Sequence, residues 1–163
     1  MQALRFRIAD RILAVDLRWV REVCPIVHLR PLPGAPAWLP GLLDYHGALL
    51  PVVDGGVALG GAPIDGHIGA RILLLHGAMD DRPDAPRASF GLRVDLVDNP
   101  FALEREGATW TAREGLPGLP FLREVVNQGD RSVLVLDAAR LASMHASLLE
   151  GPALLAATGV ARP

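Results

Sequence analysis

Residues 42–53, LLDYHGALLPVV, place two apolar runs on either side of one short polar patch, Asp44-Tyr45-His46-Gly47. Apolar runs joined by a short glycine-containing connection are typical of two strands and a tight turn. His46 would then lie beside a glycine at that turn. In this position it could be a catalytic group, a metal ligand or a contact displayed at the tip of a loop.

Toward the N-terminus the sequence predicts a second hairpin and then a rigid connector. Residues 4–9 and 12–17 alternate apolar and polar side chains, which is the period of a half-buried strand, with Asp10-Arg11 between them. Residues 19–23 predict one helical turn, and Pro25 then places an extended segment at a sheet edge or a bulge. Four prolines within residues 30–40 exclude helix interior and central strand there.

Toward the C-terminus the sequence predicts further short strands. These are residues 70–77, 88–103 with a break at Asn99-Pro100, 119–126 and 132–137, the last two forming a hairpin with Gly129 in its turn. Loops are predicted at 55–69, 78–87 and 104–118. Residues 138–150 predict the one convincing helix, because apolar side chains recur there at helical spacing, namely Leu141, Met144, Leu148 and Leu149. Roughly nine or ten short strands with little helix favour β-barrels or a sandwich.

Composition and charge argue against several classes of protein. The chain has 163 residues, of which 50% are hydrophobic, enough for one domain with a sizeable core. A net charge of −2 gives no electrostatic reason to expect nucleic-acid binding. The N-terminus lacks the apolar region of a signal peptide, and no apolar stretch approaches the roughly 20 residues of a membrane helix. We therefore expect a cytoplasmic protein with a single domain over residues 1–150 and a C-terminal tail over residues 151–163.

No motif for catalysis, metal binding or nucleotide binding is present in the sequence. The five histidines lack metal-site spacing, the single cysteine, Cys24, is typical of a packed core thiol, and no nucleophile is apparent beside His46. The best enzyme hypothesis is an acid/base pair of Asp54 and Asp95, which both follow apolar strands. An aspartate that closes a strand more often caps a turn. We expect no catalytic residue, cofactor or metal, which leaves His46 as a loop residue or a displayed contact.

Several segments, taken in order, resemble one protein family. They are Val20-Arg21-Glu22-Val23 for the family's V-x-E-I, the proline-bearing segment 36–42, the core segment 44–55, the segment 91–97 for G-hydrophobic-x-V-D-x-V, and VLVLDAARLA near the end. In their order and spacing they resemble the CheW-like domain, the adaptor fold of bacterial chemosensory arrays. The resemblance extends from about residue 4 to residue 145.

The resemblance implies an all-β fold of two packed, intertwined, five-stranded SH3-like β-barrel subdomains with a short C-terminal helix. It implies a non-enzymatic adaptor that couples the signalling tip of a methyl-accepting chemoreceptor to the regulatory domain of a CheA-type histidine kinase. Such an adaptor is recruited to receptor arrays at the inner membrane without inserting into it. The alternatives are a β-barrel that binds a small ligand between its lobes and a hydrolase using Asp54 and Asp95.

The chain departs from the family pattern in its core segment. His46 stands where the family usually has arginine, Asp44-Tyr45 where it has Asn-Leu, and Gly55 where it has leucine. Histidine side chains ordinarily change charge near neutral pH, so a permanent positive charge is lost. The DYHG segment resembles the variant in adaptors of Wsp-type surface-sensing systems, which control a diguanylate cyclase, and hence cyclic-di-GMP, rather than flagellar rotation.

The resemblance also implies which residues meet the partners. The expected partner-binding residues are Trp19, Val20, Glu22, Val23, Tyr45, His46 and Gly47. Tryptophan is a frequent energetic anchor at interfaces, although Trp19 and Val23 have core packing as an alternative role. Gly41 and Pro51 are expected to set backbone geometry. Asp54 and Asp95 are expected to cap turns and connect strands.

Overall fold

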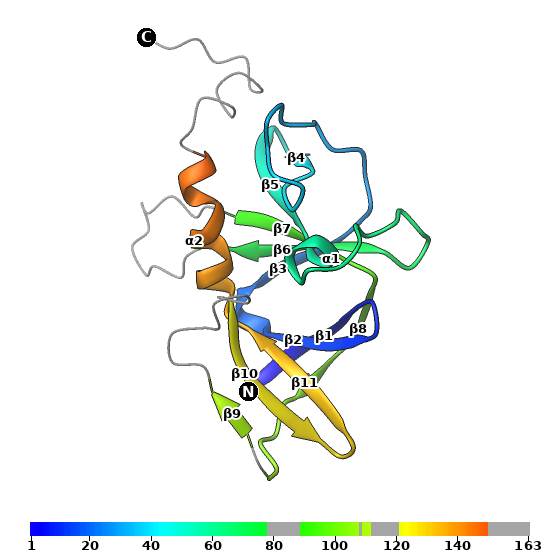
Figure 1. Ribbon diagram of the computed structural model, residues 1–163, viewed down its shortest axis with the longest axis vertical. Helices are drawn as coiled ribbons and strands as arrows, with labels where there is room; N and C mark the ends of the chain where they lie inside the picture. Colours follow the sequence, from blue (N-terminus) through cyan, green and yellow to red (C-terminus); the bar gives the residue numbers. More distant parts are fainter. Residues whose placement is uncertain (78–88, 108, 112–120, 150–163) are drawn as a thin grey trace.

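The computed structural model describes residues 1–77, 89–107, 109–111 and 121–149. Its strands form two sheets, which lie one above the other in Figure 1. The loop predicted at 78–87, the tail predicted at 151–163 and part of the loop predicted at 104–118 lie outside the described residues.

The chain builds these two sheets in an intertwined order. The six-stranded sheet has the order β8-β1-β2-β11-β10-β9, made of β1 (Gln2–Ile8), β2 (Arg11–Asp16), β8 (Leu96–Ala102), β9 (Thr109–Thr111), β10 (Leu122–Gln128) and β11 (Arg131–Leu136). The five-stranded sheet has the order β3-β6-β7-β5-β4, made of β3 (Val20–Pro25), β4 (Gly41–Tyr45), β5 (Ala48–Asp54), β6 (Arg71–His76) and β7 (Ser89–Val94). Neighbouring strands are antiparallel, except that β2 with β11 and β5 with β7 are parallel. The chain therefore starts the first sheet, builds the second, and returns to finish the first.

Central strands of the two sheets are buried on both faces. On β6, Leu73 and Leu75 belong to the main core between the sheets, whereas Ile72 and Leu74 belong to a second core inside the five-stranded subdomain. A strand buried on both faces is a continuous apolar run, which explains the sequence RILLLH. The six-stranded subdomain has a smaller core of its own on the other side of its sheet. The predicted all-β architecture of two small subdomains is thus confirmed, although one sheet has six strands.

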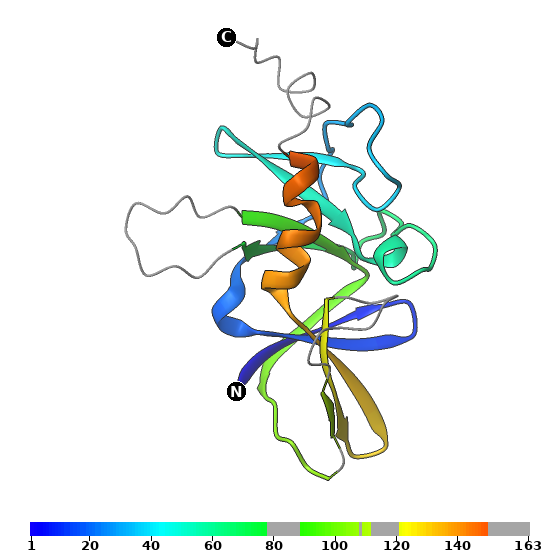
Figure 2. The same ribbon diagram turned by 60° about the vertical axis from the view of Figure 1, so that its left-hand side comes forward.

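The C-terminal hairpin and helix agree with the sequence prediction. Gly129 has a φ of 64° in the turn between β10 and β11, a conformation that glycine adopts at little cost. The helix α2 (Ala138–Leu149) begins near the junction of the two sheets and runs alongside the five-stranded sheet, as Figure 2 shows. Its Leu141 is buried in the main core. The side chains of Met144, Leu148 and Leu149 lie outside the described part of the chain.

The helical turn predicted at residues 19–23 is wrong. The structure has instead a 3-10 helix, η1 (Leu17–Trp19), and β3 begins directly after it at Val20. Asp16 explains the earlier start, because its Oδ1 accepts a hydrogen bond from the backbone N–H of Arg18, 3.0 Å away. Aspartate is a favoured residue at the N-terminus of a helical turn. Pro25 ends β3 at an edge of its sheet, as predicted.

The predicted break at Asn99-Pro100 is also wrong. The strands β7 and β8 separate at Asp95, and β8 continues through Pro100. Proline is tolerated there because β8 is an edge strand, and because the pairing with β1 shifts register between Leu4 and Phe6.

Two short elements were missed inside predicted loops. The helix α1 (Gly55–Ala58) lies in the loop predicted at 55–69, and Asp54 caps it. The strand β9 lies in the loop predicted at 104–118. All three β9 residues are exposed, and three residues are too few for the alternation of polar and apolar side chains to reveal a strand.

Candidate partner-binding site

The segment Asp44-Tyr45-His46-Gly47 forms the tip of the β4–β5 hairpin. Tyr45 pairs with Ala48, which leaves His46 and Gly47 as a two-residue loop with φ angles of 51° and 83°. Two positive φ angles define the type I′ turn that matches the twist of a hairpin. Oδ1 of Asp44 accepts a hydrogen bond from the N–H of Gly47 at 3.2 Å. The turn therefore holds His46 exposed at the end of a tight hairpin.

The two edges of the five-stranded sheet come together beside this hairpin. The chain that follows β3 returns to β4, where Arg30 and Leu42 exchange two backbone hydrogen bonds of 2.8 Å each. Gly41 makes this approach possible, because a Cβ at this position would lie 2.4 Å from the carbonyl oxygen of Arg30. The bridge closes the subdomain around its own core, as in a small barrel.

Glu22 and Tyr45 join the same two edges through their side chains. The hydroxyl of Tyr45, on β4, donates a hydrogen bond to Oε2 of Glu22, on β3. This hydrogen bond, followed by partial burial of the phenol, raises the pKa of Tyr45 above its ordinary value of 10.0. The neutral phenol is the form that can donate to the carboxylate.

Arg21 and His46 lie beside Glu22 and Tyr45 along the seam, the line where the edge strands β3 and β4 meet. The guanidinium of Arg21 lies 5.0 Å from the centre of the Tyr45 ring and donates from Nη1 to the hydroxyl of Ser89 at 3.1 Å. The ring of His46 meets the ring of Tyr45 edge to face, with 4.5 Å between their centres. We call Arg21, Glu22, Tyr45 and His46 the seam cluster. Arg21 was not among the predicted site residues, and a single sequence gives no signal for it beyond its place next to Glu22.

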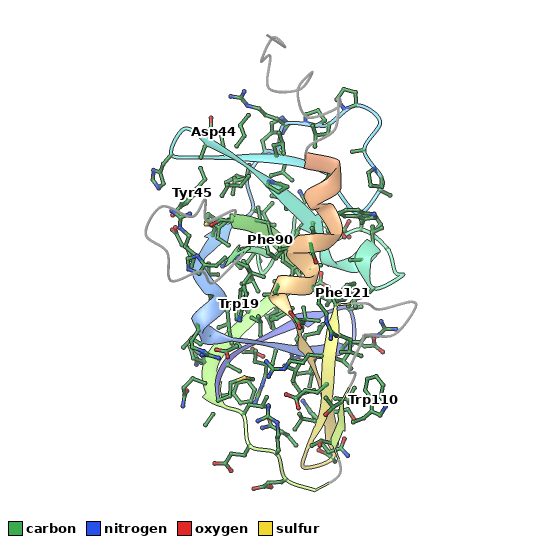
Figure 3. The ribbon with its side chains drawn as sticks, turned by 90° about the vertical axis from the view of Figure 1, so that its left-hand side faces the viewer. Trp19, Asp44, Tyr45, Phe90, Trp110 and Phe121 are labelled. Atoms are coloured by element: carbon green, nitrogen blue, oxygen red, sulfur yellow. The ribbon has the colours of Figure 1, made fainter. Side chains whose placement is uncertain are left out.

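The other predicted partner-binding residues lie on a different face. In β3, Val20 pairs with Leu75 and Val23 pairs with Leu73, so both face the side of the main core. Trp19 and Val20 are half-buried and pack against that core, whereas Val23 is 40% exposed. Figure 3 shows Trp19 and Tyr45 on the same side of the molecule, with Trp19 nearer the six-stranded sheet. The seven predicted partner-binding residues therefore fall into two groups. One group lies where the two edge strands meet, namely Glu22, Tyr45, His46 and Gly47. The other lies toward the junction of the two sheets, namely Trp19, Val20 and Val23.

The carboxylates of Asp54 and Asp95 each accept hydrogen bonds from backbone N–H groups. Asp54 is 1% exposed, and its carboxylate accepts hydrogen bonds from the N–H groups of Val57 at 3.0 Å and Ile64 at 3.1 Å. Asp95 accepts from the N–H of Ala9 at 2.7 Å and lies 3.2 Å from Nε2 of His67. The two carboxylates thus have separate sets of partners, which favours capping over a shared acid/base pair.

Pro51 is accommodated inside β5 by the pairing pattern. Tyr45 and Ala48 close the hairpin, so hydrogen-bonded pairs alternate along it and the Leu42–Pro51 pair is a non-hydrogen-bonded one. The proline nitrogen therefore faces away from β4. Pairing with β7 on the other side begins only at Val52, so Pro51 removes no bond from the ladder.

Two other features are absent from the described part of the chain. No group of three or more histidine, cysteine, aspartate or glutamate side chains lies together there as metal ligands would. Among the described residues, none of the helices is long and apolar enough to span a membrane.

Comparison with known proteins finds one matching family and several related proteins. The family model described as CheW-like domain matches residues 2–146. The chain is 22% identical to a chemotaxis protein CheW of Treponema pallidum over 87% of this chain and 82% of that protein. It is 36% identical to a chemotaxis protein CheW of Rhizobium meliloti, over 36% of this chain and 38% of that protein. The crystal structure of the scaffolding protein TtCheW from Thermoanaerobacter tengcongensis has a TM-score of 0.68 at 18% identity, covering 83% of this chain and 87% of that one.

Proposed function

This chain belongs to the family of CheW-like domains, and on that premise we propose that it is a non-enzymatic scaffold of a bacterial chemosensory complex. In this role it couples the signalling tip of a methyl-accepting receptor to the regulatory domain of a CheA-type histidine kinase. The coupling takes place at receptor arrays on the cytoplasmic side of the inner membrane. Residues 1–150 act as one unit in this assembly.

The observation that carries the proposal is the seam cluster at the closed edge of the five-stranded subdomain. A scaffold binds its partners without large internal rearrangement, so its contact groups need to be held in place beforehand. The Tyr45–Glu22 hydrogen bond and the type I′ turn hold Tyr45, His46 and Gly47 in this way. We assign these residues, with Glu22, to one partner.

Trp19, Val20 and Val23 form the second part of the proposed contact surface. They lie toward the junction of the two sheets, where an exposed valine stands beside half-buried apolar neighbours. Apolar contacts of this kind, rimmed by charged groups, are typical of protein interfaces. The two parts face opposite sides of β3, and we assign them to different partners or to two regions of one partner.

We assign the chain to a Wsp-type pathway, in which the output is cyclic-di-GMP. The support is the DYHG tip, in which His46 stands where the family usually has arginine. The identity of the response regulator phosphorylated by the partner kinase tests this assignment. A regulator fused to a diguanylate cyclase supports it, and a regulator of flagellar rotation contradicts it.

The experiment for the scaffold role reconstitutes the chain with its kinase and receptor and measures receptor-dependent phosphorylation. His46→Ala is expected to weaken the coupling while leaving thermal unfolding unchanged, because His46 is exposed and its ring contact is with Tyr45 at the same hairpin tip. His28→Ala is the matched control, since His28 is exposed outside both parts of the proposed surface. Unchanged coupling with His46→Ala removes His46 from the site.

A further inference from the structure

The six-stranded sheet contains a fork between two hairpins. The parallel strands β2 and β11 pair only from Ile12 and Val133 onward. Before that point each strand turns back into its own hairpin, through Ile8–Arg11 on one side and Gln128–Arg131 on the other. The two hairpins diverge in the lower right of Figure 1. A groove of about 510 Å³ lies here, lined by Arg7, Asp10, Arg11, Ile12, Arg131, Ser132 and Leu134.

The fork is positively charged on a chain whose net charge is −2. Its lining carries three guanidinium groups and one carboxylate, that of Asp10, and Asp98 beside Arg7 reduces the local charge to one positive unit. Nε of Arg7 lies 3.8 Å from the nearest oxygen of Asp98, at the outer limit of an ion pair. Arg11 donates to the carbonyl oxygen of Leu59 at 3.3 Å. Within the described part of the chain, neither Arg11 nor Arg131 forms an ion pair.

A second arginine-lined groove on the same subdomain gives the contrast. Arg18, Arg105 and Arg123 line it. Arg18 makes an ion pair of 2.8 Å with Asp16 and lowers the pKa of that carboxyl, and Arg105 binds the buried carboxylate of Glu124 through two nitrogens. Two of the three guanidinium groups in this groove therefore have a carboxylate partner inside the protein. In the fork, Arg11 and Arg131 have no such partner among the described residues.

We propose that the fork binds an acidic segment of a partner protein. Guanidinium groups match carboxylates in shape and bind them through two parallel hydrogen bonds. The half-buried Ile12 and Leu134 add aliphatic groups to the lining, which suit an apolar side chain in the same acidic segment. Among the described residues that line the groove, only Ser132 carries a hydroxyl, so the lining has few neutral polar groups to orient a small molecule.

This surface is separate from the one proposed above for the receptor and kinase. The seam cluster belongs to the five-stranded subdomain, whereas the fork is built by β1, β2 and β11 of the six-stranded sheet. The inference therefore stands whether or not the seam cluster binds its proposed partner.

The test uses a fluorescein-labelled synthetic peptide, Glu-Glu-Leu-Glu-Glu, titrated with the full chain and followed by fluorescence anisotropy. We expect saturable binding that weakens as salt is raised, because exposed charges are screened. Arg131→Glu is expected to weaken binding about fivefold, the upper end of the range for one exposed ion pair. Arg123→Glu, which changes the net charge equally but lies in the other groove, is the matched control and should leave the affinity nearly unchanged.

Four results would overturn the inference. The first is no binding of the peptide, and the second is equal binding of the matched glutamine peptide. The third is an equal loss of affinity in Arg123→Glu, which would mean a nonspecific response to charge. The fourth is displacement of the peptide by inorganic pyrophosphate at lower concentration than by unlabelled peptide, which would make the fork a small-anion site.

Discussion

The hydroxyl of Tyr45 donates a hydrogen bond to the carboxylate of Glu22, and this bond connects the two edge strands of the five-stranded sheet. Together with the Arg30–Leu42 backbone bridge, it closes a subdomain that would otherwise have two free edges. Closure protects the sheet from pairing with other chains. It also fixes the hairpin tip that carries His46 relative to β3.

This relationship can be measured because Tyr45 is the only tyrosine in the chain. The absorbance of tyrosinate on the long-wavelength side of the aromatic band therefore reports the titration of Tyr45 alone. We predict that Tyr45 titrates above its ordinary value of 10.0, since the hydrogen bond to Glu22 and partial burial raise its pKa. Glu22→Gln should move the titration back toward that value. A titration at the ordinary value in the unmodified chain would contradict the hydrogen bond.

The same bond predicts how stability changes with pH. The pKa of Tyr45 is higher in the folded chain than in the unfolded chain, so its stabilisation is complete below the unfolded value. It is lost as pH rises through the folded value. The free energy of unfolding should therefore fall with pH above about 10. In Tyr45→Phe this part of the fall should be absent, and an identical pH profile in the two proteins would argue against the prediction.

Gly41→Ala is predicted to destabilise the fold strongly. The new methyl group would lie 2.4 Å from the carbonyl oxygen of Arg30, a backbone atom that cannot move without opening the bridge. We expect a loss of about 3 kcal/mol in the free energy of unfolding, at the upper end of the range for overpacking. Gly66→Ala is the control, since its Cβ would meet only Ile26 at 3.9 Å, and should change stability by less than about 0.5 kcal/mol. Chemical denaturation measures both, and equal effects would refute the close approach.

Asp54→Asn separates a capping role from a catalytic one. The buried carboxylate holds the N–H groups of Val57 and Ile64, so we expect a loss of about 1–3 kcal/mol in the free energy of unfolding. Asp95→Asn should cost less, because the Asp95 side chain is partly exposed. A hydrolase would instead lose turnover in both variants while keeping its stability, and that pattern would restore the acid/base hypothesis.

Arg105→Ala tests the ion pair inside the six-stranded subdomain. The variant leaves the carboxylate of Glu124 buried without its cation, and a loss of about 1–2 kcal/mol is expected, reduced because the Arg105 side chain is 42% exposed. The double variant Arg105→Ala with Glu124→Leu should recover part of that loss, because it removes the unpaired charge as well. No recovery in the double variant would mean that Glu124 is solvated in the absence of Arg105.

Local patterns made much of the fold predictable. The hairpin at residues 42–53 follows from two apolar runs and a His-Gly turn, and the C-terminal hairpin from Gly129, because turn chemistry acts between neighbours in sequence. The helical turn was misplaced because the capping carboxylate of Asp16 lies before the segment that looked helical. The strand through Pro100 depended on its position at a sheet edge, which only the completed topology reveals.

The candidate site was predictable only in part. His46 and Gly47 could be placed at a turn from their own sequence, but the contact of Tyr45 with Glu22 joins residues 23 positions apart. The spacing of Glu22 and Tyr45 in the sequence does not reveal that the sheet closes and brings its two edge strands together. The fork has the same origin, because Arg131 joins Arg7 and Arg11 of the β1–β2 hairpin only through the parallel pairing of β2 with β11. Such sites depend on topology and not on local pattern.

Affinity capture of the tagged chain from the cells that produce it, followed by mass spectrometry, tests the scaffold role most directly. We predict that a CheA-type histidine kinase and a methyl-accepting receptor are both enriched, and that His46→Ala recovers less of at least one of them than His28→Ala does. A folded chain that enriches neither protein would contradict the scaffold role.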